Sequence, residues 1–396
     1  MENFTKLFLA VAALFAVSCT TDVTEDLGVQ LGEGQTAITL SLEASRTQLG
    51  EKAGEVYPLL WSEGDKISVN GVESSEAVID GANGAVASFA VSASAPYCIA
   101  YPAAPTGQVL FAEKQAYTSN TTFGSGVATM YGYSEDGLGV QLNHLTGVLK
   151  IGVVGSAKLA MAQISTVDRA PIAGAFELNF TNGELKATTA SKEVIEYSFG
   201  EGVQLSSEPT YIHVAVPAGV YDELYVTLYD VEGGVMYATV KANNEKPLAV
   251  GKVREFSSNI PYAATDKVFV VKDVATLKEF AAQAATLEKD VLFVADVDMT
   301  GEAWTPIEGY AKTVRGNGYA IKGMTAPLFG TTNASIKGLH LRDVALASND
   351  NPIVGGLVCV LNATDAIIPV VEHCSVSGTF TIENTNYVPN NTHSSR

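Results

Sequence analysis

Polar and apolar residues alternate along much of the first 262 positions of the chain. Thr36–Leu42 reads Thr-Ala-Ile-Thr-Leu-Ser-Leu, and Tyr225–Tyr229 reads Tyr-Val-Thr-Leu-Tyr. A period of two predicts strands with one buried face. No long helical period precedes residue 270, so the pattern predicts antiparallel sheets. The expected tight turns between strands are Asn70-Gly71, Asp80-Gly81, Asn83-Gly84, Asn182-Gly183 and Gly233-Gly234.

Four segments in this region carry recognisable motifs. They are Arg46–Leu49 (Arg-Thr-Gln-Leu), Leu60–Val69 (Leu-Trp-Ser-Glu-Gly-Asp-Lys-Ile-Ser-Val), Tyr97–Pro102 (Tyr-Cys-Ile-Ala-Tyr-Pro) and Leu142–Ile151 (Leu-Asn-His-Leu-Thr-Gly-Val-Leu-Lys-Ile). In this order they resemble the strand motifs of fimbrillin-like proteins of the Bacteroides group. The resemblance implies two tandem antiparallel β-sandwich domains, at residues 36–141 and 142–262. It also implies a pilus subunit or a surface adhesion module.

The residues of these motifs have structural interpretations. Trp61 is expected to anchor the first core, because an indole ring buries a large apolar area. Gly64 and Asp65 are expected to form a turn in which the aspartate binds its own backbone. His144 lies between two leucines at an expected strand start, where a satisfied edge histidine is favoured over a metal ligand. A catalytic Asp65 is the weaker alternative.

The pattern changes after residue 262. Asp273–Ala284 places Val274, Leu277, Phe280 and Ala281 on one face of a predicted helix, with Asp273 as the N-cap. Short apolar runs with intervening glycines follow it. They lie in Val291–Met299, Trp304–Ile307, Val314–Gly323, Leu328–Gly330, Ile336–Val344, Gly355–Val358 and Glu372–Gly378.

This order resembles the start of a right-handed parallel β-helix with GLUG-type repeats. The resemblance implies a helix-capped stack of coils over residues 263–396. The predicted fold class is therefore all-β: two tandem sandwiches followed by the capped start of a β-helix. Because no amphipathic element is left to cover the last coil, we expect a truncated product. The alternative is a polar tail that folds back over that coil.

The N-terminus has the pattern of a bacterial lipoprotein signal. Lys6 precedes the apolar run Leu7–Phe15, and Ala16-Val17-Ser18 leads directly to Cys19. The run is too short for a membrane span, which needs about 20 apolar residues. Residues 1–18 are the predicted signal peptide. In the lipoproteins that the segment resembles, the cysteine carries lipid, so Cys19 is the predicted anchor. An ordinary secretory signal with an incidental cysteine is the alternative.

Composition and charge narrow the class of partners. The chain has 24 Lys and Arg against 43 Asp and Glu, a formal charge of −19. This charge opposes binding to nucleic acid or to anionic lipid. A hydrophobic content of 47% with 17% charged residues indicates folded domains, and residues 19–35, which are polar and acidic, are the expected tether.

With Cys19 assigned to lipid, Cys98, Cys359 and Cys374 remain. An odd number without a Cys-x-x-Cys pair does not indicate a disulfide framework or a zinc site. Cys98 is interpreted as a small core residue. Cys359 and Cys374 are either neighbours in adjacent coils or a disulfide.

Asp296 and Asp298, on alternate residues of one strand, are weak calcium candidates, with turn or solvent positions as the favoured interpretation. β-Helix polysaccharide lyases combine carboxylate-bound calcium with a basic residue, but Lys312, Arg315 and Lys322 are expected at turns. His340, Arg342 and Asp343 are expected on a solvated stripe. The motifs of serine hydrolases, zinc proteases and phosphate loops do not occur. No catalytic residue and no cofactor are predicted.

The sequence predicts a non-enzymatic, lipid-anchored adhesin or pilus-related accessory protein of the outer membrane and cell surface. Its expected partners are the membrane, other pilus subunits, or glycans or proteins of host and bacterial surfaces. In pilus-forming relatives an arginine-specific protease removes the N-terminal strand, and Arg46 is the residue placed for this cleavage. The favoured interpretation of Arg46 is nevertheless a polar residue at the end of a strand. The alternative function is a glycan-binding or lyase-like β-helix whose site lies in missing coils.

Overall fold

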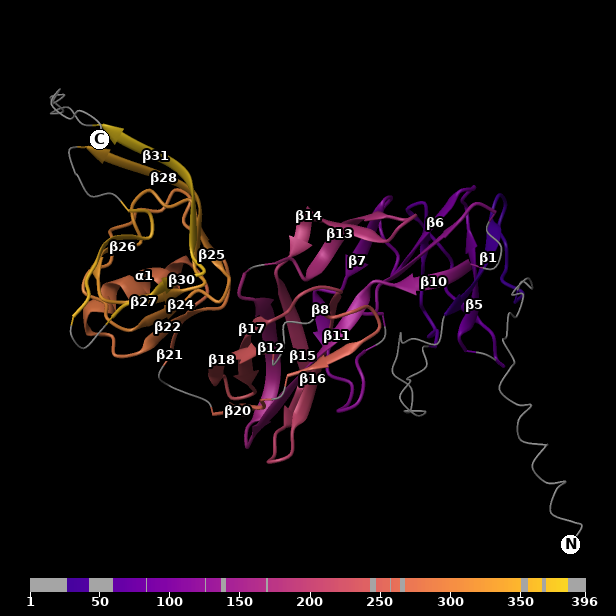
Figure 1. The fold of residues 1–396 in the computed structure, drawn as a ribbon, viewed down its shortest axis with the longest axis horizontal. Helices are drawn as coiled ribbons and strands as arrows, with labels where there is room; N and C mark the ends of the chain where they lie inside the picture. The colour runs from indigo at the N-terminus through magenta and orange to yellow at the C-terminus, as the bar shows by residue number, and fades with distance from the viewer. Residues whose placement is uncertain are drawn as a thin grey trace, which may run out of the picture.

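The chain is almost entirely β-structure. The computed structural model describes residues 27–42, 60–82, 84–124, 126–136, 140–168, 170–242, 247–256, 258–263, 268–349, 355–364 and 368–383. Figure 1 shows an elongated molecule, with β1 and β5 at one end and the parallel strands around α1 at the other. The predicted predominance of strands before residue 270 is confirmed.

The first region is an eight-stranded sheet in the order β3-β2-β6-β9-β10-β1-β5-β4. β1 lies inside it, antiparallel to β5 and parallel to β10. Its alternate residues Ile38, Leu40 and Leu42 enter the core, which explains the period of two seen in the sequence. The strands are β1 (Thr36–Leu42), β2 (Ser68–Val69), β3 (Val72–Glu73), β4 (Val78–Ile79), β5 (Val86–Val91), β6 (Tyr97–Tyr101), β9 (Met130–Ser134) and β10 (Val140–His144).

Sheets of three, four and five strands make up the second region. Their orders are β14-β13-β7, β16-β11-β19 with β20 also on β11, and β18-β17-β12-β15-β8. The strands are β7 (Gln108–Phe111), β8 (Lys114–Ala116), β11 (Thr146–Gly155), β12 (Lys158–Thr166), β13 (Ala173–Asn179), β14 (Glu184–Lys192), β15 (Val194–Gln204), β16 (Thr210–Pro217), β17 (Glu223–Asp230), β18 (Val235–Lys241), β19 (Val253–Glu255) and β20 (Ile260–Tyr262).

Two short strands pair on the far side of the predicted domain boundary at residue 141. β7 runs antiparallel to β13, with Leu110 opposite Ala175. β8 runs parallel to β15, with Gln115 opposite Tyr197. Residues 108–116 therefore belong to the sheets of the second region, although the first sheet continues after them with β9 and β10.

The third region consists of parallel sheets. Their orders are β21-β22-β24-β27-β30, β23-β25-β28-β31 and β26-β29, and every pairing within them is parallel. The strands are β21 (Val268–Val271), β22 (Asp290–Phe293), β23 (Val297–Asp298), β24 (Thr313–Arg315), β25 (Ala320–Lys322), β26 (Phe329–Thr332), β27 (Ser335–Lys337), β28 (His340–Asn349), β29 (Val358–Leu361), β30 (Val371–Glu372) and β31 (Ser375–Glu383). β28 and β31 run together beyond the rest of the region (Figure 1).

The three parallel sheets bury one common core. Val291 pairs with Val314, and Val314 with Ile336, and all three side chains are fully buried. The second sheet repeats the arrangement with Val297, Ile321 and Leu341. Each strand thus adds one apolar residue to a continuous column, and the faces become buried only because the strands stack.

The predicted helix is confirmed as α1 (Val274–Gln283), followed by the 3-10 turn η1 (Ala284–Thr286). Asp273 caps it, since its carboxylate accepts from the Thr276 amide at 2.8 Å and the Thr276 hydroxyl accepts from the Asp273 amide at 3.1 Å. Leu277 and Phe280 are buried against the parallel sheets. In the part of the chain that the structure describes, no helix is long and apolar enough to cross a bilayer.

The Trp61 motif lies mostly outside the strands. The indole is buried and contacts Phe89 and Tyr101 edge-on, at centroid distances of 5.1 and 5.2 Å. Asp65 forms the predicted turn by accepting from the Ser62 amide at 2.8 Å, and it also accepts from the Tyr101 hydroxyl at 2.8 Å. Burial raises the pKa of this carboxyl group. These contacts confirm the structural interpretation of Trp61 and of the Gly64-Asp65 turn.

The segment Leu142–Ile151 is two strands and not one. β10 ends at His144 and β11 begins at Thr146, and the residue between them, Leu145, is buried in a different apolar cluster from that of β10. His144 therefore ends a strand of the first sheet, where it lies opposite Met130, and does not start a strand as expected. The chain passes from the first region to the second at this break.

His213 in β16 gives the second region a pH dependence. Its ring is buried, Nδ1 has no hydrogen-bond partner among the described residues, and burial with the nearby Lys150 ammonium lowers its pKa to about 4. The unfolded chain therefore binds a proton below pH 6.5 that the folded chain does not, so this histidine costs stability as the pH falls from 6.5 to 4. The loss is at most about 3 kcal/mol. We expect His213→Leu to flatten the stability curve in this window. Equal slopes for both proteins in urea titrations at several pH values would contradict the assignment.

Candidate functional site

The two site residues predicted with the most specific chemistry, Cys19 and Arg46, lie outside the described residues. Lipid attachment at Cys19 and proteolysis at Arg46 stay predictions.

The acidic pair Asp296 and Asp298 binds backbone amides. Asp296 Oδ1 accepts from the Ala320 amide at 2.7 Å, and Asp298 Oδ1 accepts from the Thr300 amide at 2.9 Å. The second interaction lowers the pKa of Asp298. Among the described residues, no group of three or more His, Cys, Asp and Glu side chains is arranged to hold a metal ion. Asp296 lies between β22 and β23 and Asp298 ends β23, so the two residues are not on one strand as expected.

The three described cysteines are free thiols, and each is half-buried. Cys374 Sγ donates to the Glu372 carbonyl at 3.2 Å, and burial raises the pKa of its thiol. The alternative of a disulfide between Cys359 and Cys374 is not realised. Cys98 packs partly against an apolar cluster, as a small hydrophobic residue would.

The predicted solvated stripe is solvated only in part. His340 is buried, and its Nδ1 lies 2.7 Å from the Ser375 hydroxyl of the neighbouring strand. Arg342 forms an ion pair with Glu193 of the second region, with Nη2 and Oε1 3.3 Å apart. Asp343 is exposed, 3.9 Å from Lys322. A sequence pattern cannot indicate a partner as distant as Glu193, because the contact depends on how the two regions dock.

The second and third regions meet through buried polar groups. Asn317 Nδ2 donates to the Thr227 hydroxyl at 2.6 Å, and the Ser165 hydroxyl donates to the Asn317 carbonyl at 3.4 Å. Thr227 and Ser165 lie on β17 and β12, and all three residues are at most 3% exposed. In an isolated sheet these polar residues would face water, so their burial marks a continuous interface.

This interface allows a direct test. Thr227→Val keeps the shape of the side chain but leaves the Asn317 amide buried without its acceptor, which costs about 1–3 kcal/mol. We expect the third region to unfold at lower urea concentration in the full chain. Asn317→Gly accepts the positive φ of 51° at this position and removes the amide. In the Thr227→Val protein, Asn317→Gly should therefore lower the free energy of unfolding by less than it does in the wild type. Equal losses in the two proteins would contradict the contact.

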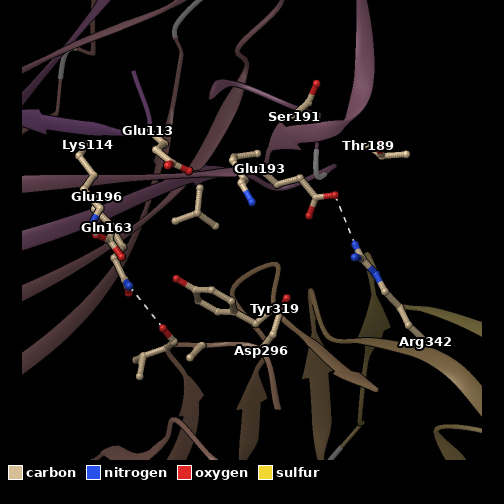
Figure 2. Close-up of a pocket in the computed structure, with 14 residues that line it drawn as sticks. Glu113, Lys114, Gln163, Thr189, Ser191, Glu193, Glu196, Asp296, Tyr319 and Arg342 are labelled. Atoms are coloured by element: carbon tan, nitrogen blue, oxygen red, sulfur yellow. Dashed lines mark hydrogen bonds and ion pairs between the residues drawn. The ribbon is translucent and has the colours of Figure 1, made fainter. Parts of the chain in front are cut away.

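A cleft of about 480 Å³ lies beside this interface. One wall comes from β8, β14 and β15 and carries Glu113, Lys114, Lys192, Glu193 and Glu196. The opposite wall comes from the third region and carries Asp296, Tyr319 and Arg342. Figure 2 shows Glu113 and Glu193 facing Tyr319 and Asp296 across the open space.

Two contacts between the regions hold the cleft walls together. At one side, Gln163 Nε2 donates to the Val294 carbonyl at 3.3 Å, while its Oε1 accepts from the Tyr229 hydroxyl at 2.8 Å. At the other side lies the Arg342–Glu193 ion pair (Figure 2). The two walls are therefore connected at both sides of the cleft.

Both signs of charge line the cleft. Lys114 forms a long ion pair with Glu196, at 3.7 Å. Glu113 and Lys192 are exposed and form no side-chain hydrogen bond or ion pair with another described residue. Tyr319 is 8% exposed and packs into the core of the third region, so its ring is held rigidly. The arrangement offers hydrogen-bond donors and acceptors from several side chains, which is the chemistry of a polar binding site.

No protein-family model matches the chain, and no curated protein matches it. Two solved structures, described as "putative cell adhesion protein" and taken from Bacteroides ovatus and Bacteroides fragilis, are similar to it with 8% and 11% identity and TM-scores of 0.31 and 0.30. They cover 54% and 58% of this chain, and 88% and 99% of their own length is matched. A fimbrial assembly protein from Parabacteroides distasonis has 10% identity and a TM-score of 0.19, over 52% of this chain and 99% of its own.

Proposed function

We propose that the protein is a non-enzymatic, lipid-anchored adhesin of the cell surface, in which the first two regions form a stalk and the third is the ligand-facing module. The observation that carries this proposal is the elongated arrangement. β1, which follows the predicted anchor at Cys19, lies at one end of the molecule, and the third region lies at the opposite end (Figure 1). An anchor at the first end would hold the third region away from the membrane.

The sheet pairings support finer assignments for the regions. Antiparallel pairing predominates in the first two regions, as in tandem β-sandwiches. Three parallel sheets with stacked apolar columns are the arrangement expected of a parallel β-helix. The buried face of α1 packs on the same core, which supports its assignment as the cap.

The interface between the second and third regions supports the stalk. Its hydrogen bonds are buried, and Val194 of β15 packs against the core of the third region. A second contact lies at β18, where the Arg315 guanidinium stacks over Tyr237 at 4.8 Å. A binding module that is docked in this way keeps a defined orientation on the stalk.

The proposed function is tested by adhesion of intact cells. Cells that lack the gene, cells that carry it, and cells that carry the Cys19→Ser form are allowed to settle on mucin-coated surfaces and on layers of sister cells. We expect adhesion only of cells that carry the anchored form. On these intact cells, added protease should cleave the third region. Equal adhesion of all three strains, or a third region protected from protease on intact cells, would refute the proposal.

Proteolysis at Arg46 would give the protein a route into a pilus. β1 lies between β5 and β10, so its removal would open a groove lined by the partners of Ile38 and Leu40. We expect that protein from pilus-forming cells, if processed, begins after Arg46, and that Arg46→Ala blocks this cleavage. Sequencing the N-terminus of surface material tests both statements. A mature protein that still begins at Cys19 would exclude polymerisation by this route.

A further inference from the structure

The cleft between the second and third regions has no assigned ligand, and its position is informative. Clefts between domains are common ligand sites, and ligand pockets measure about 300–1,000 Å³. The cleft, at about 480 Å³, fits this range. Because Gln163 and Arg342 both bind across it, the site forms only when the two regions are docked.

The lining excludes several classes of ligand. Four carboxylates, Glu113, Glu193, Glu196 and Asp296, face three cations, Lys114, Lys192 and Arg342. This balance, in a chain of formal charge −19, disfavours an anionic polymer. A largely apolar ligand would leave these polar groups without water or partners.

An uncharged saccharide satisfies the same groups. Its hydroxyls both donate to carboxylates such as Glu113 and accept from ammonium groups such as Lys192. Tyr319 lines the opposite wall but is only 8% exposed, so it offers a small, rigid contact and no open ring face (Figure 2). The two cross-contacts limit the ordering of the walls, whereas the exposed side chains of Glu113 and Lys192 must be ordered on binding.

We propose that this cleft binds an uncharged mono- or disaccharide unit of a surface glycan. The proposal names the ligand class of the adhesin described above and therefore rests on the proposed function. Glu113 and Lys192 are the direct hydrogen-bonding groups, and Tyr319 is a small rigid contact on the opposite wall. Gln163 and Arg342 are positioning residues, because they hold the two walls.

The first test is binding in solution. The full mature chain carrying Cys19→Ser is titrated by calorimetry with lactose, cellobiose and N,N′-diacetylchitobiose, and with digalacturonate as the anionic probe. We expect at least one uncharged disaccharide to bind and Glu113→Ala to weaken it about 10-fold, the loss expected for one hydrogen bond to a charged group. Thr189→Trp adds bulk at an exposed rim position and should abolish binding without disturbing the core. Glu208→Ala, an exposed site outside the cleft, is the matched control and should bind as the wild type does.

The possible outcomes separate this inference from the proposed function. If no uncharged disaccharide binds, if only digalacturonate binds, or if Thr189→Trp binds as well as the wild type, the cleft assignment is wrong. Cells carrying the anchored Thr189→Trp protein are then compared in the adhesion assay. Adhesion that depends on the protein but survives this substitution would leave the proposed function intact and place the ligand on another surface. Adhesion lost together with saccharide binding supports both.

Discussion

Cys19→Ser is expected to move the protein from the membrane to the soluble fraction. A hydroxyl cannot replace the thiol that the lipoprotein pathway acylates, and the described part of the chain has no helix that could hold it in a bilayer. A single acyl chain gives only marginal membrane binding, whereas several give a stable anchor, so loss of the lipid should release nearly all of the protein.

Fractionation and palmitate labelling measure this effect. Ser18→Ala, which keeps a small residue before the cysteine, is the matched control and should behave as wild type. Palmitate incorporated equally into the Cys19→Ser protein would show that the N-terminal segment is not a lipoprotein signal.

Trp61→Ala is expected to be the most destabilising single substitution in the first region. The indole is 4% exposed and contacts Phe89 and Tyr101 edge-on, so its removal leaves a cavity between rings that cannot close over it. Replacing a buried tryptophan by alanine costs about 3–5 kcal/mol.

The effect is measured by scanning calorimetry of the full chain, in which the transition of the first region should shift to lower temperature. Val72→Ala is the control, because Val72 is 43% exposed and substitutions at such surface sites change stability by about 0.5 kcal/mol or less. An unchanged melting profile for Trp61→Ala would mean that the indole does not hold this core together.

Local signals in the sequence predicted local structure well. The alternation in Thr36–Leu42 gave β1, and the pairing of Asp273 with Thr276 lies behind the capping box of α1. Asn70-Gly71 forms the tight turn between β2 and β3, with positive φ at both residues. In each case the physical cause lies within a few neighbouring residues, where a sequence pattern can report it.

The candidate site could not be predicted in this way. Its walls unite residues 113–196 with residues 294–342, and nothing in either stretch indicates the other. Asn317 falls within the short apolar run Val314–Gly323, but its amide is buried against Thr227 from another region. The sequence pattern of a strand is the same whether the polar residues on its outer face contact water or another region of the protein.

The crossing of β7 and β8 into the second region also bears on the order of folding. A chain is synthesised from its amino end, so residues 108–116 are made before β13 and β15, their sheet partners. β9 and β10, which follow residues 108–116 in the chain, then complete the first sheet. The two regions therefore cannot fold one after the other as separate units. Cutting the chain at residue 141 would separate β7 and β8 from the sheets that they complete. If the first region were exchanged between related proteins, the β7 and β8 that come with it would have to pair with β13 and β15 of the second region.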